Sequence, residues 1–179
     1  MKTDKALFWE LIEPEYERAA MFCRKLTGSR DLGDDLLQDG LLAAHNKFHT
    51  LRDHLAFRAW LYRILVNRFT SQTRRPWWKR RVSLTPALAD SLGTEDPQDV
   101  LTARRWLQKA FVVLSPAEQA LVTLHELEGW SVTDLAELNG KTEGATKAAL
   151  FRARRKMQRA LLDLQIAGTE QVTGAVSET

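Results

Sequence analysis

Three histidines in the first third of the chain are the first residues to consider for chemistry. His45 and His49 are four residues apart, a spacing that puts two imidazoles on one helix face, and His54 follows soon after. Imidazole is a common zinc ligand, but a structural zinc site takes four ligands, and no cysteine or carboxylate completes this set. We therefore expect no metal and interpret these histidines as exposed polar residues around a loop.

The other reactive side chains do not combine into a catalytic site. Cys23 is the only cysteine, so no internal disulfide can form, and a reducing cytoplasm is the natural setting. We expect Cys23 to be a small buried apolar residue rather than a redox sensor. No nucleophile with a base and an orienting group can be assembled, and no glycine-rich phosphate loop occurs in the sequence. The sequence predicts neither an enzyme nor a bound cofactor.

The charges are distributed unevenly along the chain, although the net charge is only +3. Residues 54–89 contain eight basic side chains and no acidic one, and residues 144–162 contain six basic side chains and no acidic one. The segment between them, 90–143, holds four basic and ten acidic residues. Two acid-free basic stretches indicate two contacts with a polyanion such as nucleic acid, with solvated helix faces as the alternative.

The composition is typical of a water-soluble globular protein. Of the 179 residues, 44% are hydrophobic and 27% are charged. No apolar run approaches the roughly 18 residues of a membrane span, and the N-terminal residues do not resemble a signal peptide. We expect a cytoplasmic protein with no stable insertion into a membrane.

The elements that position the basic stretches are predicted to be helices, because apolar residues recur at three- and four-residue spacing. A first helix is expected to end at Gly28, and a second to run from about 31 to 47. Residues 48–55 are polar and lack periodicity, which is typical of a loop. A third helix is expected from about Ala56, and Pro76 must end or kink it.

The fold class predicted from these patterns is all-α, with two small helical domains joined by a flexible linker. The linker is placed where proline, glycine, small and acidic residues gather. A disordered tail is expected at the C-terminus. The predicted segments are a first domain at 1–81, the linker at 82–98, a second domain at 99–165 and the tail at 166–179.

The second domain has the pattern of a helix-turn-helix. Ser115-Pro116-Ala117-Glu118 is a strong helix start, and Gly129 ends that helix. A short helix begins after Ser131, Gly140 supplies a tight turn, and a long basic helix follows Thr142, which we expect to cap it. Such a motif places its second helix in the major groove of DNA. A helical hairpin with a solvated basic face is the alternative.

Side chains on the long helix divide into an apolar stripe and a basic face. The stripe is expected to pack on the domain core, while N-terminal residues off the stripe can reach base edges. Three further basic residues, Arg154, Lys156 and Arg159, can contact phosphates, which position the protein without reading sequence.

At this point the residues resemble a known family. Residues 128–138 (EGWSVTDLAEL), with 144–147 (GATK) and 151–154 (FRAR), resemble region four of the extracytoplasmic-function (ECF) sigma factors.

The first half of the chain resembles region two of the same family. Residues 34–39 (DDLLQD) resemble its polymerase-binding helix, and residues 57–64 (FRAWLYRI) with Asn67 resemble its promoter-melting helix. The linker is too short for the middle domain that larger sigma factors carry.

The resemblance implies an alternative sigma factor that binds core RNA polymerase and directs promoter-specific transcription initiation. It implies contacts with polymerase at Asp34, Asp35, Gln38 and Asp39. It implies contacts with the minus-ten promoter element at Phe48, with the loop after it, and at Arg63, Asn67, Arg68, Arg74 and Arg75. It implies contacts with the minus-thirty-five element at Thr142, Lys147, Ala148, Phe151, Arg152 and Arg155. The partners implied are core RNA polymerase, promoter DNA and an anti-sigma factor.

Three residues depart from the family pattern and keep other functions open. Lys141, Thr146 and Ala149 leave the recognition helix with fewer side chains for base readout. A sigma-like decoy, which binds an anti-sigma factor without initiating transcription, is therefore one alternative. A dimeric helix-turn-helix repressor is another, but it would leave the first half of the chain unexplained.

Overall fold

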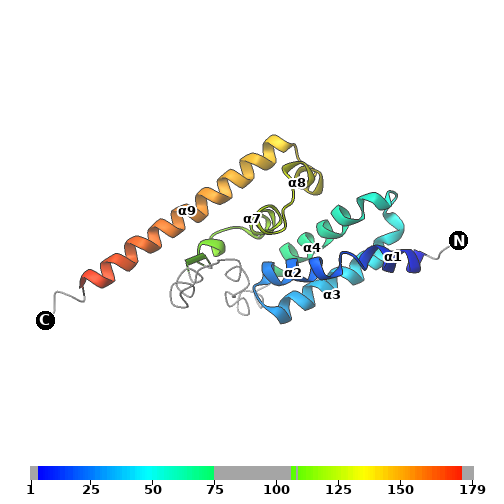
Figure 1. Cartoon of the computed structure of the whole chain (residues 1–179), viewed down its shortest axis with the longest axis horizontal. Helices are drawn as coiled ribbons and strands as arrows, with labels where there is room; N and C mark the ends of the chain where they lie inside the picture. The colour runs from blue at the N-terminus through cyan, green and yellow to red at the C-terminus, as the bar shows by residue number, and fades with distance from the viewer. Residues whose placement is uncertain (1–3, 75–105, 108, 175–179) are drawn as a thin grey trace.

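The computed structural model describes residues 4–74, 106–107 and 109–174 (Figure 1). Every regular element in these ranges is a helix, and no strand occurs among them, which confirms the all-α prediction. The predicted linker, 82–98, lies outside the described residues, so the domain boundaries stay predictions.

Four α-helices form the N-terminal half: α1 (Asp4–Ile12), α2 (Tyr16–Thr27), α3 (Arg30–Lys47) and α4 (Phe57–Thr73). The single first helix predicted from the sequence is wrong, because Pro14 separates α1 from α2. Proline has no amide hydrogen to donate and its ring crowds the preceding turn, so a helix seldom continues through it. The apolar residues keep their helical spacing across this break, so the spacing alone did not predict it.

The turn between α2 and α3 matches its local sequence signals. Gly28 is left-handed, with φ 66°, and its amide donates to the carbonyl of Arg24 at 2.8 Å. The Ser29 hydroxyl then accepts the amide of Leu32 and caps α3. This turn brings α3 so close to α2 that a Cβ on Gly33 would lie 2.6 Å from the Cα of Arg24.

Two short 3-10 turns, η1 (Phe48–Thr50) and η2 (His54–Ala56), make up the loop before α4. The Asp53 carboxylate accepts the Leu55 amide at 2.9 Å and begins the second turn. The predicted loop therefore has local helical structure, although it lies between longer helices as expected.

The C-terminal half contains the predicted helix-turn-helix. The elements of this half are α7 (Pro116–Val122), the π-helical turn η4 (Thr123–Leu127), α8 (Val132–Asn139) and α9 (Glu143–Gly174). Helices α8 and α9 form the helix-turn-helix. A capping box begins α7 at Ser115 and Gly140 adopts φ 61° at the turn, as the sequence predicted. Helix α8 begins after Ser131 as expected, with a second capping box that was not predicted.

Helix α9 is longer than predicted from the sequence (Figure 1). It continues to Gly174, whereas a disordered tail was expected from residue 166. Between Leu164 and Gly174 there is no proline and only one glycine, Gly168, so no strong signal stops the helix. In the described part of the chain, no helix combines the length and the apolar character that a membrane span requires.

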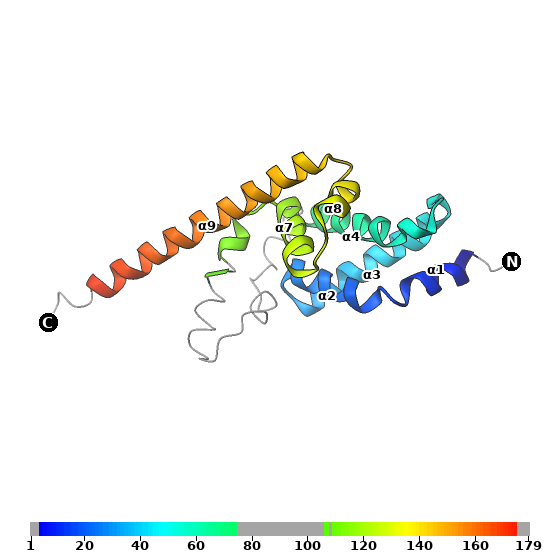
Figure 2. The same cartoon turned by 45° about the horizontal axis from the view of Figure 1, so that its top comes forward.

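The two halves pack against each other. Helix α4 lies beside α7 and α8 (Figures 1 and 2), and buried residues from both halves belong to one continuous hydrophobic cluster. Tyr62 from α4 and Trp130 from the segment before α8 are both buried in it. The sequence predicted two helical units but contained no signal for this contact between them.

The close approach at Gly33 generates a stability prediction. Substitution of Gly33 with alanine should force α3 away from the backbone of α2 and destabilise the protein by about 1–3 kcal/mol. The melting temperature, measured by circular dichroism, should fall by roughly 3–10 °C. Gly144→Ala is the matched control, because nothing lies within 4 Å of a Cβ built there, and it should be neutral or slightly stabilising. Equal melting temperatures for the two variants would contradict the assigned packing.

Candidate protein and nucleic-acid interfaces

An acidic and amide face lies on α3. Asp35, Gln38 and Asp39 are exposed, at positions that follow one another by one helical turn or less. Asp39 accepts a hydrogen bond from Gln72 of α4 at 3.0 Å, while Asp35 and Gln38 point away from the core. The exposed carboxylates and amide are therefore available to a partner that carries hydrogen-bond donors.

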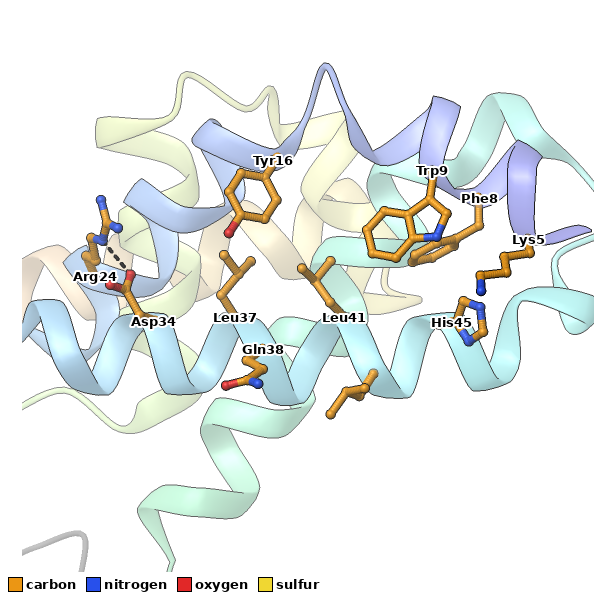
Figure 3. Close-up of a pocket in the computed structure, with 11 residues that line it drawn as sticks. Lys5, Phe8, Trp9, Tyr16, Arg24, Asp34, Leu37, Gln38, Leu41 and His45 are labelled. Atoms are coloured by element: carbon orange, nitrogen blue, oxygen red, sulfur yellow. Dashed lines mark hydrogen bonds and ion pairs between the residues drawn. The ribbon is translucent and has the colours of Figure 1, made fainter.

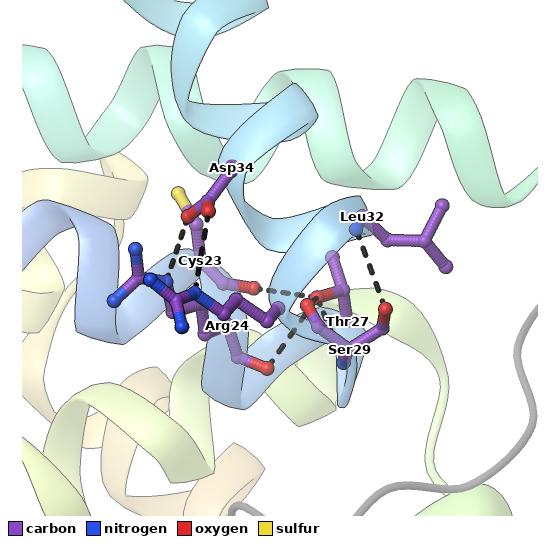
Figure 4. A network of polar contacts seen from close by, with 7 residues as sticks. Cys23, Arg24, Thr27, Ser29, Leu32 and Asp34 are labelled. Carbon is purple, nitrogen blue, oxygen red and sulfur yellow. Dashed lines mark hydrogen bonds and ion pairs between the residues drawn. The ribbon is translucent and has the colours of Figure 1, made fainter.

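Asp34, the fourth residue predicted for this face, is engaged within the protein (Figure 4). Its carboxylate accepts from the guanidinium of Arg24 at 2.7 Å and lies 4.0 Å from that of Arg30. This contact joins α2 to α3 beside the Gly33 crossing. Asp34 consequently holds the N-terminal part of α3 against α2, and its carboxylate is less available to a partner than that of Asp35.

A groove of about 650 Å³ runs beside this face between α3 and the α1–α2 segment (Figure 3). It is lined by apolar and aromatic side chains together with five polar or charged ones: Lys5, Arg24, Asp34, Gln38 and His45. Trp9 is 50% exposed and Leu42 is 60% exposed, which is unusual for such large apolar residues. These two residues could not be predicted from the sequence, because the helical periodicity of apolar residues does not show which of two adjacent leucines, Leu41 or Leu42, faces the core.

The predicted minus-ten residues on α4 fall into two groups. Asn67, Arg68 and Arg74, the last just beyond the end of α4, are exposed. Arg63 is exposed as well, but its guanidinium is also bonded to the other half of the chain. Arg75 lies outside the described residues.

Phe48 is a core residue, and the prediction that it grips a base is wrong for this structure. Its ring is only 5% exposed, stacks on His54 with centroids 5.6 Å apart, and meets Phe8 and Phe57 edge-on. These rings cover the faces that a base would need for stacking. In the loop that follows, Leu55 is 96% exposed, and the sequence contained no signal for that.

Helix α9 presents the predicted readout residues on one exposed face. Thr142 caps the helix by accepting the amide of Ala145 at 3.2 Å, as expected. Leu150 and Ala153 are buried on the opposite side. The predicted residues off the apolar stripe are all exposed: Lys147, Ala148, Phe151, Arg152 and Arg155.

Contacts within α9 order part of this face. The guanidinium of Arg155 lies over the Phe151 ring, 5.8 Å from its centroid, and Lys147 pairs with Glu143 at 3.7 Å. Arg152 is exposed one residue from Phe151. A planar guanidinium with five donors can bind the two guanine acceptors in the major groove, so this face is chemically suited to DNA.

Two of the three residues that were expected to contact DNA phosphates instead form ion pairs that join α9 to the rest of the C-terminal half. Arg154 donates to Glu126 at 2.8 Å, and Lys156 donates to Glu118 at 2.6 Å. Partial burial opposes ionisation of Glu118, but the hydrogen bonds from Lys156 and Ser115 hold the pKa of its carboxyl below the usual range. Arg159 remains exposed and keeps the phosphate role as a prediction.

The remaining reactive residues form no reactive centre where the structure describes them. Within those ranges no group of three or more histidine, cysteine and acidic residues is placed to hold a metal ion. Burial raises the pKa of the Cys23 thiol far above its usual range, and the nearby Asp34 carboxylate adds to this effect. A thiol held in its neutral form is a poor nucleophile and does not suit a redox sensor.

Comparisons with known proteins agree with the resemblance. Residues 11–79 match the family described as Sigma-70 region 2, and residues 104–157 match Sigma-70, region 4. ECF RNA polymerase sigma factor SigM of Mycobacterium tuberculosis is 28% identical over 158 residues, covering 88% of this chain and 79% of that protein.

A second curated relative and a solved structure show the same similarity. ECF RNA polymerase sigma factor SigF of Caulobacter vibrioides is 30% identical over 136 residues, covering 75% of this chain and 73% of that protein. The sigma factor RpoE from Bartonella quintana, solved in complex with the anti-sigma factor NepR, aligns with a TM-score of 0.60 and 26% identity, covering 86% of this chain and 96% of that one. This chain belongs to the ECF RNA polymerase sigma factor family.

Proposed function

We propose that the protein is an alternative sigma factor that binds core RNA polymerase in the cytoplasm and directs it to a specific set of promoters. The observation that carries the proposal is the order of regions in one chain: a Sigma-70 region 2 match precedes a region 4 match. Each match falls on helices that expose polar side chains. No covalent chemistry is required, because the protein acts by binding and positioning.

The polymerase contact is assigned to the exposed face of α3 and the adjoining groove. Carboxylate and amide groups at Asp35, Gln38 and Asp39 suit a partner surface that carries arginines, because charge-assisted hydrogen bonds are strong and directional. Trp9 and Leu42 add exposed apolar area beside them. An apolar patch beside polar groups is the usual composition of a protein–protein interface.

The promoter contacts are assigned to α4, the loop before it, and α9. The exposed residues Asn67 and Arg68 of α4, with Arg74 just after its end, supply an amide that can read a base edge and two charges for phosphates. The loop at 51–56 remains the candidate for holding an unstacked base, without Phe48. On α9, the exposed face that holds Arg152 reads the minus-thirty-five element in the major groove.

An anti-sigma factor is proposed as a further partner, on the basis of the RpoE–NepR complex to which this chain is similar. The decoy alternative gains no support, because the curated relatives are named as RNA polymerase sigma factors. A decoy and a sigma factor differ in one respect that can be measured: only the sigma factor supports run-off transcription with core polymerase.

The polymerase assignment is tested with Asp35→Ala combined with Gln38→Ala. Loss of these two hydrogen-bonding side chains should weaken binding to core polymerase by about tenfold or more, since each charged hydrogen bond contributes roughly 1.5–3 kcal/mol. Competition against a fluorescently labelled wild-type protein measures this affinity. The control, Asp163→Ala, removes one carboxylate from an exposed position on α9 and should bind like the wild type. Wild-type affinity in the double variant would refute the assignment.

The recognition-helix assignment is tested by comparing two arginines on α9. Arg152→Ala should cost about 1–3 kcal/mol of promoter affinity and blur the preference at one or two base pairs. Arg159→Ala, two turns further along, should weaken all sequences alike and reduce the salt dependence of binding. The measurement is binding of reconstituted holoenzyme to a series of promoter variants at several salt concentrations. A preference altered by Arg159→Ala and unaffected by Arg152→Ala would show that α9 docks differently.

A further inference from the structure

Leu55, in the connection between α3 and α4, is far more exposed than the other large apolar residues in the described ranges. It is 96% exposed, and the next two, Leu42 and Phe151, are each 60% exposed. Figures 1 and 2 both place this connection at the end of the N-terminal half that is far from α9. Single exposed apolar residues are common on protein surfaces. Leu55 differs from them in the turn that presents it.

The turn that carries Leu55 is held by the residues on both sides of it. The Asp53 carboxylate accepts the amide of Leu55 at 2.9 Å, and the Asp53 carbonyl accepts the amide of Ala56 at 3.2 Å. The ring of His54 stacks on the buried ring of Phe48, with the two planes 10° apart. The leucine side chain therefore projects from a fixed point, and little conformational entropy is lost when it is inserted into a partner.

The charges around Leu55 favour an anionic partner. Arg52 is exposed on one side of it, and no acidic residue occurs between residues 54 and 89 on the other. Asp53 is the only acid between residues 48 and 58, and its carboxylate already accepts the hydrogen bond that begins the turn. An apolar side chain among cations is matched by nucleic acid, in which apolar base stacks lie between two lines of phosphates.

The position of Leu55 relative to α4 places it within the minus-ten element. Phe57 begins α4 directly after the turn, and Asn67, to which base reading is assigned, follows Phe57 by ten residues. Ten helical residues span about 15 Å at a rise of about 1.5 Å per residue. Laid along B-DNA, that length corresponds to roughly four base-pair steps of about 3.4 Å. Leu55 consequently reaches the same short stretch of promoter as Asn67, from its other end.

We propose that Leu55 opens the promoter strands by entering the base stack of the minus-ten element and filling the space that a base leaves when it swings out. The inference rests on the proposed function and deepens its assignment of the loop at 51–56. Apolar side chains inserted between base steps unstack them, and a base that leaves the stack must lose its stacking and pairing. The leucine side chain forms no hydrogen bonds, so it reads no sequence. It acts by hindering the return of the base.

The test compares the full-length wild type with Leu55→Ala, each reconstituted with core polymerase, on a promoter that the wild-type holoenzyme transcribes. One template is fully paired, and the other is mismatched through the minus-ten element, so that its strands are already apart. Permanganate reactivity of unpaired thymines measures the rate of opening on the paired template, and single-round transcription measures activity on both. Leu55→Ala should open the paired template at least about tenfold more slowly than the wild type. On the mismatched template it should transcribe within about twofold of the wild type, because the step that needs Leu55 is already complete.

Two further variants serve as controls. Leu162→Ala removes the same atoms from a residue of α9 that is 53% exposed and lies beyond residue 157, where the region 4 match ends. It should behave like the wild type on both templates. Leu55→Met keeps the apolar bulk and should retain most of the opening rate on the paired template. Because Leu55 is so exposed, its replacement should leave the melting temperature unchanged, which circular dichroism checks.

Three results would overturn the inference. The first is opening of the paired template by Leu55→Ala at the wild-type rate. The second is an equal loss of transcription on both templates, since Leu55 would then act at a step other than opening. The third is weaker binding of Leu55→Ala to core polymerase, which would assign the residue to a protein interface.

Failure of this inference can be distinguished from failure of the proposed function. If the wild-type protein with core polymerase yields no promoter-specific transcript on any template, the proposed function is overturned, and the role of Leu55 falls with it. If the wild type transcribes and Leu55→Ala is equally active on the paired template, only the role of Leu55 is overturned.

Discussion

Burial of Trp130 between the two halves is the contact on which the arrangement of the molecule depends. The indole ring follows Gly129, whose positive φ of 69° turns the chain out of the preceding helical segment. Once the ring is seated against Tyr62 and Arg58, α8 lies along α4 and its C-terminal carbonyls meet Arg63. The same contact therefore fixes the position of the helix-turn-helix and covers part of α4.

The surfaces proposed to bind polymerase and promoter differ in how far this packing involves them. The acidic face of α3 and the adjoining groove lie away from the interface between the halves, and so does the exposed face of α9 at Phe151 and Arg152. Arg63 of α4, a predicted minus-ten residue, donates hydrogen bonds to the other half of the chain.

The local features of the fold could be predicted from the sequence, because their causes are local. Gly28 and Gly140 mark left-handed turns, and Ser115 and Ser131 begin helices through hydrogen bonds that span only three residues. The features that were missed depend on tertiary packing. Periodicity could not show that Phe48 is enclosed by Phe8, His54 and Phe57 or that Leu42 is exposed, and the partners of Arg63 lie about 75 residues away along the chain. The residue types therefore predicted the family and the helices that carry the candidate binding surfaces. Which individual side chains are exposed, and which are bonded within the protein, could be seen only in the structure.

The most direct test of the central claim, that this chain is a promoter-specificity subunit, is transcription of genomic DNA fragments by core RNA polymerase with and without the protein. Sequencing of the transcript 5′ ends identifies the start sites. A sigma factor predicts a limited set of start sites that appear only when the protein is added and that share sequence elements near minus ten and minus thirty-five. An unchanged set of start sites, despite binding of the protein to polymerase, would contradict the claim.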